Sequence, residues 1–283
     1  MSSSSAIWES STLPRQSVNR LAAAAIAASL AFLGPAVAAP VRIVSLNLCT
    51  DQLAVLLLPK SRIASLSYLV RDPHLSRVAD RAAGIPTNRG GAEEAIAARP
   101  DLVLADRGTS RDTLALLRRM NVDVYQHDVP DDVAGIEQET RRLAAALDAR
   151  EAAEALLTEM RNRLAMIRPP GAKVTALWFF PNAYTSGRGT LSDTALTAAG
   201  FVNLAPRVGY AGISVEELII ARPDRLVLQH DDAPTFSNAA AVLAHPAVNA
   251  LWAPSRRIDL PGNLLICGAP FFAEAVERLA AAR

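Results

Sequence analysis

The stretch EEAIAARPDLVL, at Glu93 to Leu104, returns in the same chain as EELIIARPDRLVL, at Glu216 to Leu228. The first nine positions align without a gap at an offset of 123 residues, and both copies carry Glu-Glu and Ala-Arg-Pro-Asp. Self-similarity within one chain indicates a repeated structural unit. Two copies are too few for a stack of repeats, so the repetition predicts two similar lobes. Each lobe should contain a short helix, an Arg-Pro-Asp turn and a strand.

Strands and helices alternate around the first copy. Four segments are predicted to be strands: RIVSL (42–46), RIASLSYL (62–69), DLVLA (101–105) and VDVYQ (122–126). Helices are predicted at TDQLAVLLL (50–58), EEAIAA (93–98) and SRDTLALLRRM (110–120), with Thr50 or Asp51 capping the first and Ser110 capping the last. Such alternation is typical of parallel strands joined by helical crossovers, and it predicts an α/β lobe.

The same alternation surrounds the second copy. Strands are predicted at KVTALWFF (173–180), RLVL (225–228) and RRIDL (256–260). Helices are predicted at TLSDTALTAAG (190–200), EELIIA (216–221) and APFFAEAVERLAAA (269–282). The C-terminal half is therefore expected to form a second α/β lobe.

Two consecutive helices separate the halves. Asp131 or Asp132 can cap the first, and Asp148 has the spacing of a capping-box residue for the second, which should run over 149–167. Pro169-Pro170-Gly171 should end it. A helix of that length spans roughly 28 Å at about 1.5 Å per residue, enough to cross between two small lobes. The sequence thus predicts two Rossmann-like lobes (39–148 and 169–283) joined by a single long α-helix (149–168).

The N-terminus resembles an export signal. Residues 1–20 are polar and contain Arg15 and Arg20, LAAAAIAASLAFL follows as a short apolar run, and Ala36-Val37-Ala38 is a small-residue cleavage site. We expect residues 1–38 to be a signal peptide cleaved near Ala38, which places the mature protein in the periplasm. An uncleaved anchor is the alternative, but the run is shorter than the roughly 20 residues that span a bilayer.

The charge of the mature chain excludes some classes of partner. Removing Arg15, Arg20 and Glu9 leaves 27 basic and 27 acidic residues, so the chain from residue 39 on is formally neutral. No basic stripe suggests nucleic-acid binding and no basic amphipathic helix suggests a membrane surface. Cys49 and Cys267 are the two cysteines, and an even count in an oxidising compartment makes a disulfide the default.

The usual marks of catalysis are missing from the sequence. It contains no G-x-S-x-G, no Walker A loop and no H-E-x-x-H. The four histidines, among them His127, are far apart without metal-ligand spacing, so we expect surface or loop histidines, no metal site and no cofactor.

Two features suggest a ligand-binding edge. Gly187-Arg188-Gly189 follows a strand and precedes a helix, where free N–H groups and Arg188 could meet an anionic or carbonyl-rich ligand, although an ordinary turn would have the same residues. Aromatic residues fall at predicted strand ends or in loops, where they are either local plugs or the lining of a cleft for a large, partly planar ligand: Tyr68, Phe179, Phe180, Tyr184 and Tyr210.

Taken in order, five stretches resemble the periplasmic binding proteins that serve ABC importers for iron–siderophore complexes and cobalamin. They are RIVSLNLCTDQL, SYL, NRGGAEEAIAARPDLVLADRG, YTSGRGTLSDTALTAAGFVNLA and SVEELIIARPDRLVL. The resemblance runs from about Arg42 to the C-terminus. It implies two α/β lobes joined by a rigid helix, with the ligand in the cleft between them, and a monomer that delivers the ligand to an inner-membrane ABC permease and its ATPase.

The resemblance also implies roles for residues. Glu93 and Glu216, one per lobe, match the acidic positions that meet arginines on the permease; stabilisation of the helix dipole is the alternative role. Residues expected to ring the cleft are Asn47, Cys49, Tyr68, Asn88, Arg89, Arg107, Tyr184, Arg188 and Cys267. A large ligand in that cleft leaves no room for a bridge, so we expect Cys49 and Cys267 to be unpaired thiols there.

The resemblance narrows the ligand without fixing it. Heme-binding relatives carry a Tyr near the position of Asn88 or Arg89 and cobalamin-binding relatives carry a Trp in that region; this chain has neither there. The expected ligand is a ferric siderophore or a cobalamin-type metal chelate. The alternative function is a periplasmic enzyme on a similar two-lobed frame.

Overall fold

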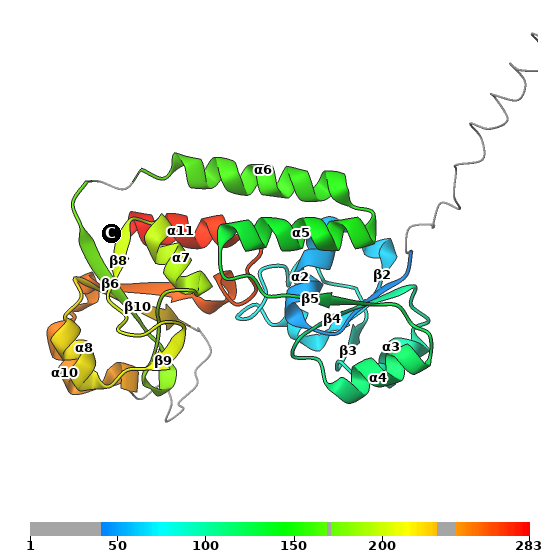
Figure 1. The fold of residues 1–283 in the computed structure, drawn as a ribbon, viewed down its shortest axis with the longest axis horizontal. Helices are drawn as coiled ribbons and strands as arrows, with labels where there is room; N and C mark the ends of the chain where they lie inside the picture. Colours follow the sequence, from blue (N-terminus) through cyan, green and yellow to red (C-terminus); the bar gives the residue numbers. More distant parts are fainter. Residues whose placement is uncertain (1–40, 169–170, 231–241) are drawn as a thin grey trace, which may run out of the picture. The chain divides into compact units, whose positions relative to one another are not determined.

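The computed structural model describes residues 41–168, 171–230 and 242–283 (Figure 1). The predicted signal peptide and the Pro169-Pro170 pair that was expected to end a helix lie outside the described residues. Within them, no helix is both long and apolar enough to cross a membrane.

The first half of the chain forms a five-stranded parallel sheet in the order β3-β2-β1-β4-β5. Its strands are β1 (Ile43–Ser45), β2 (Ile63–Ser67), β3 (Thr87–Asn88), β4 (Leu102–Asp106) and β5 (Val124–His127). The helices of this half are α2 (Leu48–Leu57), α3 (Ala92–Ala97) and α4 (Arg111–Arg119), with short 3-10 turns at Lys60–Arg62 and Tyr68–Arg71. The predicted first α/β lobe is confirmed.

The second half forms a four-stranded parallel sheet in the order β11-β10-β6-β8. Its strands are β6 (Val174–Phe179), β8 (Phe201–Asn203), β10 (Arg225–His230) and β11 (Arg257–Pro261). A separate antiparallel pair, which the sequence did not predict, consists of β7 (Tyr184–Ser186) and β9 (Tyr210–Gly212). The helices are α7 (Leu191–Ala198), α8 (Val215–Ala221), α10 (Pro246–Leu251) and α11 (Phe272–Ala281). Among the described residues of this half, 3-10 turns lie at Pro181–Ala183, Val242–Ala244, Pro254–Arg256 and Gly262–Leu264.

Two helices, α5 (Val133–Leu147) and α6 (Arg150–Met166), connect the sheets, where the sequence predicted that the second alone would do so. Leu143 and Leu147 of α5 lie in the core of the first sheet, whereas Ile136 of the same helix lies in the core of the second. The helix α6 likewise contributes Ala153 to the first core and Leu157 to the second. It packs against α5, α2 and α11, and Figure 1 shows it running past α5 and α11. Each of the two helices therefore spans both cores.

Helix caps confirm some sequence predictions and correct others. Ser110 and Asp132 cap α4 and α5 through their side chains, as predicted. The cap of α2 is Asn47, not Thr50 or Asp51, because the helix begins at Leu48. Asp148 does not cap α6 either: it ends α5 in a left-handed conformation with φ of 50°.

The structure explains why one sequence occurs twice. In each copy a short helix, α3 or α8, leads into a strand that pairs with the first strand of its own sheet: β4 with β1, and β10 with β6. Asp101 accepts hydrogen bonds from the backbone N–H groups of Val41 and Arg42 just before β1. Asp224 does the same for the N–H and hydroxyl of Thr175 in β6. The Asp of each Arg-Pro-Asp thus fixes the beginning of the first strand of its lobe.

Candidate ligand-binding and docking sites

The carboxyl ends of parallel strands are where open α/β sheets bind ligands. In the first sheet, four residues predicted to bind ligand come directly after or within two residues of such ends: Asn47 after β1, Tyr68 after β2, Arg89 after β3 and Arg107 after β4. The topology therefore brings these four residues to one edge of the sheet. They are not equally available to a ligand.

Tyr68 and Arg89 are exposed at a cavity of the first sheet, whereas Asn88 lines the same cavity but is almost fully buried. A cavity of about 580 Å³ is lined by Tyr68, Thr87, Asn88, Arg89 and Glu94, and the Tyr68 side chain is 58% exposed. Asn88 is buried, donates hydrogen bonds to Ser45 O and Ser65 Oγ at 2.9 Å each, and accepts one from Gly90 N. These contacts tie the ends of β1, β2 and β3 together, so Asn88 has a supporting position beneath the cavity.

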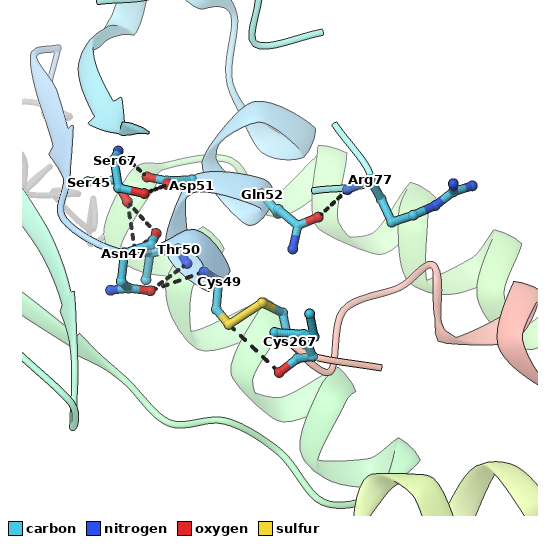
Figure 2. The surroundings of a disulfide bond; sticks show 10 residues. Ser45, Asn47, Cys49, Thr50, Asp51, Gln52, Ser67, Arg77 and Cys267 are labelled. Atoms are coloured by element: carbon cyan, nitrogen blue, oxygen red, sulfur yellow. Dashed lines mark hydrogen bonds between the residues drawn. A yellow bond between two sulfur atoms is a disulfide. The ribbon is translucent and has the colours of Figure 1, made fainter. Parts of the chain in front are cut away.

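Asn47 also has a structural position. Its side-chain oxygen accepts hydrogen bonds from the N–H groups of Cys49 and Thr50, at 3.1 Å each, and so caps α2. Nearby, the fully buried Asp51 accepts hydrogen bonds from the Ser67 N–H and hydroxyl. Burial raises the pKa of Asp51 to about 7, and hydrogen bonds from Ser45 and Ser67 oppose that rise. Figure 2 shows this polar network beside the first turn of α2.

Arg107 lies at a second opening of the first sheet. A cavity of about 330 Å³ is lined by Asp106, Arg107, Gly108, His127, Asp128, Val129 and Asp131. The exposed Arg107 guanidinium forms an ion pair with Asp128, so the positive charge at this opening is paired with a carboxylate.

His127 corrects the prediction that the histidines lie on the surface. Its side chain is fully buried, with Nδ1 2.9 Å from Glu139 Oε1. Glu139 also accepts hydrogen bonds from the Tyr125 hydroxyl at 2.7 Å and from Arg142 Nε at 2.7 Å. Burial of Glu139 acts to raise its pKa, but the hydrogen bonds from His127, Arg142 and Tyr125 outweigh burial and lower the pKa to about 2. This group joins β5 to α5, and we assign it a structural role.

The second sheet carries an aromatic cavity at the corresponding edge. Its volume is about 380 Å³, and it is lined by Trp178, Phe180, Pro181, Tyr184, Ser192, Tyr210, Gln229, Leu260, Pro261, Gly262, Leu265 and Ile266. Among the described residues that line the cavity, none carries a charged side chain. The Trp178 and Phe180 rings are stacked with centroids 5.4 Å apart and planes inclined by 7°. Trp178 itself is almost fully buried, so the aromatic surface open to the cavity comes from Phe180, Tyr184 and Tyr210. Aromatic rings of this kind suit the face of a large planar ligand.

The alternation of side chains along β6 determines which aromatic residues lie at the cavity. Because side chains alternate along a strand, Trp178 and Phe180 share the cavity side of β6, and Phe179 points to the opposite side. Phe179 is the last residue of β6, as expected of a strand end, but it is fully buried in a core cluster, so it is a plug and does not line a cleft. Tyr184 and Tyr210 reach the cavity from β7 and β9 and are 49% and 60% exposed. Trp178 was not predicted from the sequence to be a cavity residue. The signal for it is that Trp178 and Phe180 are two residues apart in the predicted strand KVTALWFF, so that their side chains lie on the same side.

Arg188 is exposed on the turn before α7 and does not line the aromatic cavity. The turn closes through hydrogen bonds of Gly187 N to Gly209 O and of Gly209 N to Arg188 O, at 2.9 Å each. A Cβ on Gly187 would lie 1.8 Å from Arg207 O, so the glycine permits a close backbone approach. Thr190 caps α7 through Asp193 N, which uses one of the N–H groups that had been expected to meet a ligand.

Cys49 and Cys267 form a disulfide with Cα atoms 5.0 Å apart, so the prediction of two unpaired thiols lining the cleft is wrong. Both residues are buried and pack with Leu48, Leu69 and Leu75. Figure 2 shows the bond joining the first turn of α2 to the loop that precedes α11. The reasoning failed because a loop of the second half of the chain, and not a ligand, occupies the space next to Cys49.

The repeated glutamates differ within each Glu-Glu pair. The second member is engaged in its own lobe: Glu94 accepts a hydrogen bond from Arg89 N at 2.6 Å, and Glu217 forms a capping box with Ser214. The first members, Glu93 and Glu216, are exposed in the first turns of α3 and α8. These two carboxylates occupy matching places in the two copies and face solvent.

No group of three or more His, Cys, Asp or Glu side chains that could hold a metal ion occurs among the residues that the structure describes. The described residues provide three cavities at the sheets and exposed carboxylates on α3 and α8.

Comparison with known proteins identifies the family. Residues 43–254 match the family model of the periplasmic binding proteins, and this chain belongs to that family. It is 26% identical over 193 residues to a cobalamin-binding protein of Halobacterium salinarum, an alignment that covers 64% of this chain and 52% of the relative. The chain thus spans about half the length of the curated relatives it matches.

Solved structures share the fold. A periplasmic heme-binding protein from Pseudomonas aeruginosa aligns with a TM-score of 0.70 and 25% identity, covering 86% of this chain and 92% of that one. A protein of an ABC-type Fe³⁺-hydroxamate transport system from Saccharomonospora viridis aligns with a TM-score of 0.68 and 20% identity, covering 86% of this chain and 93% of that one. A vitamin B12-binding protein of Vibrio cholerae aligns with a TM-score of 0.61 and 17% identity, covering 86% of this chain and 96% of that one. The predicted resemblance to periplasmic binding proteins is therefore confirmed.

Proposed function

We propose that this protein is the solute-binding component of an ABC importer, and that it captures a ferric siderophore or a cobalamin-type metal chelate. The observation that carries the proposal is the aromatic cavity around Phe180, Tyr184 and Tyr210, whose described lining residues carry no charged side chain. Such a surface can cover the apolar face of a large chelate, while Tyr68, Arg89 and Arg107 of the first sheet provide polar and charged groups for its periphery.

The comparisons support this class of ligand. The relative in Halobacterium salinarum is named for cobalamin, and the solved neighbours are named for heme, a ferric hydroxamate and vitamin B12. All of these are metal chelates or parts of systems that transport them. Since these are substrate-binding proteins, we propose that this chain also binds its ligand without transforming it, in preference to the alternative of a periplasmic enzyme.

Delivery requires a partner in the membrane. We propose that the mature protein, released by cleavage near Ala38, acts as a monomer in the periplasm and docks on an inner-membrane permease driven by an ATPase. Glu93 and Glu216 are the proposed docking residues, because matching exposed carboxylates on two similar lobes suit basic residues on a two-fold permease. Their role in helix stabilisation is the competing explanation.

A thermal-shift screen tests the proposed function. Vitamin B12, hemin and a ferric trihydroxamate are each added at a hundredfold excess over the expected submicromolar Kd, beside a free amino acid and a sugar. Binding to the folded state alone should add about 2.7 kcal/mol of stability at that excess. A shift with one of the chelates supports the proposal, and a shift only with the amino acid or the sugar would refute it.

A further inference from the structure

Residues 262–267, which we call the wall segment, form one side of the aromatic cavity. Gly262, Leu265 and Ile266 line the cavity, and Leu264 is fully buried in the core of the second sheet. The segment follows β11 directly and belongs to the second lobe by sequence.

The contacts that anchor the wall segment come from the first lobe as well. Cys267 is joined to Cys49 in α2, and Cys49 Sγ lies 4.0 Å from Ile266 O (Figure 2). Asn263 Nδ2 donates a hydrogen bond to Pro73 O at 2.8 Å. The wall of the second lobe's cavity is thus held by two residues that the first lobe supplies.

The next residue, Gly268, lies close against Pro130. It has a left-handed φ of 48°, and a Cβ built there would lie 2.6 Å from Pro130 Cγ. Asn47, which caps α2 through Cys49 N and Thr50 N, fixes the first turn from which Cys49 projects. Both ends of the disulfide are therefore attached to backbone that other contacts hold in place.

We propose that the Cys49–Cys267 disulfide is a positioning element for the ligand: it contacts no ligand itself, and it holds Leu265 and Ile266 at the distance from Trp178 and Phe180 that ligand retention requires. This inference rests on the proposed function, since it assigns the aromatic cavity to the ligand. It predicts that the bond controls the rate of ligand release in addition to the stability of the fold.

The test compares wild type with Cys49→Ala/Cys267→Ala, with Asn263→Ala, and with Leu117→Ala as a control. Leu117 is a fully buried residue of α4 in a different core cluster, so its truncation destabilises the protein without touching the wall segment. Asn263→Ala removes the hydrogen bond to Pro73 O and keeps the disulfide, which provides a milder variant if the double variant folds poorly.

Two quantities are measured on each protein. Hydrogen exchange followed by mass spectrometry reports the opening of residues 262–267, and stopped-flow dilution reports the dissociation rate of vitamin B12, hemin or a ferric trihydroxamate. We expect both rates to rise by roughly tenfold or more in the double cysteine variant, to rise by less in Asn263→Ala, and to stay unchanged in Leu117→Ala.

The outcomes separate the two proposals. Unchanged dissociation in the double cysteine variant, or an equal change in Leu117→Ala, would overturn the positioning role and leave the bond a stabilising crosslink only. If wild type binds none of the three chelates, the proposed function fails, while hydrogen exchange still decides whether the disulfide fixes the wall segment.

Discussion

Removal of the disulfide should lower the free energy of unfolding by several kcal/mol, and the length of the loop that the bond closes allows this loss to be estimated. The bond closes a loop with a sequence separation of 218 residues, for which the chain-entropy model gives about 5 kcal/mol at 25 °C. Measured effects are usually smaller than that model predicts, so we expect Cys49→Ala/Cys267→Ala to lower the free energy of unfolding by about 2–5 kcal/mol. Alanine is a suitable replacement because it is apolar, and the side chains packed around the bond are leucines.

The assay is urea unfolding of wild type, of both single alanine variants and of the double variant, with fluorescence and circular dichroism as probes. If the cysteines are bonded, either single substitution removes the whole crosslink, and the two effects do not add. Two results would indicate unpaired thiols and refute the structural reasoning. In the first, the single substitutions have small effects on the free energy of unfolding that add up in the double variant. In the second, the double variant loses less than about 1 kcal/mol of that free energy in total.

Three further predictions concern the pair Glu93 and Glu216, the buried Asp51 and the turn residue Gly187. Glu93→Arg with Glu216→Arg should abolish uptake into vesicles, while ligand affinity and Tm barely change, because exposed rim charges set docking more than folding. Asp51→Asn should stabilise the protein relative to wild type more at pH 8 than at pH 5 in denaturant titrations, since the pKa of Asp51 is raised to about 7 by burial. Gly187→Ala should lower the free energy of unfolding by about 1–3 kcal/mol or more, because the new Cβ would lie 1.8 Å from Arg207 O.

Each of these predictions has a result that would contradict it, and two of them have a matched control variant. For docking, Asp112→Arg with Glu151→Arg makes the same charge change in the first turns of α4 and α6, and equal loss of uptake there would exclude a specific role for the repeated glutamates. For Asp51, the folded state binds the proton more tightly than the unfolded state, so the stability of wild type falls between about pH 4 and pH 7. A pH-independent difference between Asp51→Asn and wild type would contradict the raised pKa. For Gly187, a neutral effect would mean that the turn relaxes freely, and Gly171→Ala, with open space around its Cβ, is the matched control.

Much of the fold could be predicted because its periodicities are local. The repeated Glu-Glu and Arg-Pro-Asp segments indicated two lobes, and in the structure Asp101 and Asp224 have the same hydrogen-bonding role at the beginnings of β1 and β6. The short strands β7 and β9 were missed, since the glycine-rich stretch around Gly187 has no alternating pattern and is ordered by pairing with a distant segment.

The candidate site could be predicted only in part, because what lies next to a residue depends on the whole fold. Tyr184 and Tyr210 line the aromatic cavity, which is one of the two alternatives that the sequence left open for them. Asn88, in contrast, donates hydrogen bonds to Ser45 O and Ser65 Oγ, which the sequence could not reveal. The disulfide was missed for the same reason: nothing local to Cys49 reveals that a loop more than two hundred residues later fills the space beside it.

The central claim is that the aromatic cavity binds a metal chelate, and isothermal titration of vitamin B12 and of a ferric trihydroxamate into wild type and Tyr210→Ala tests it most directly. Tyr210 is 60% exposed at the cavity, so its truncation should spare the fold, and Met120→Ala is the control for loss of an exposed apolar side chain elsewhere. We predict submicromolar binding of one chelate to wild type, unchanged binding to Met120→Ala, and binding weakened by roughly tenfold or more in Tyr210→Ala, which corresponds to about 1.4 kcal/mol. Equal affinity in all three proteins, or no binding of either chelate to wild type, would contradict the account.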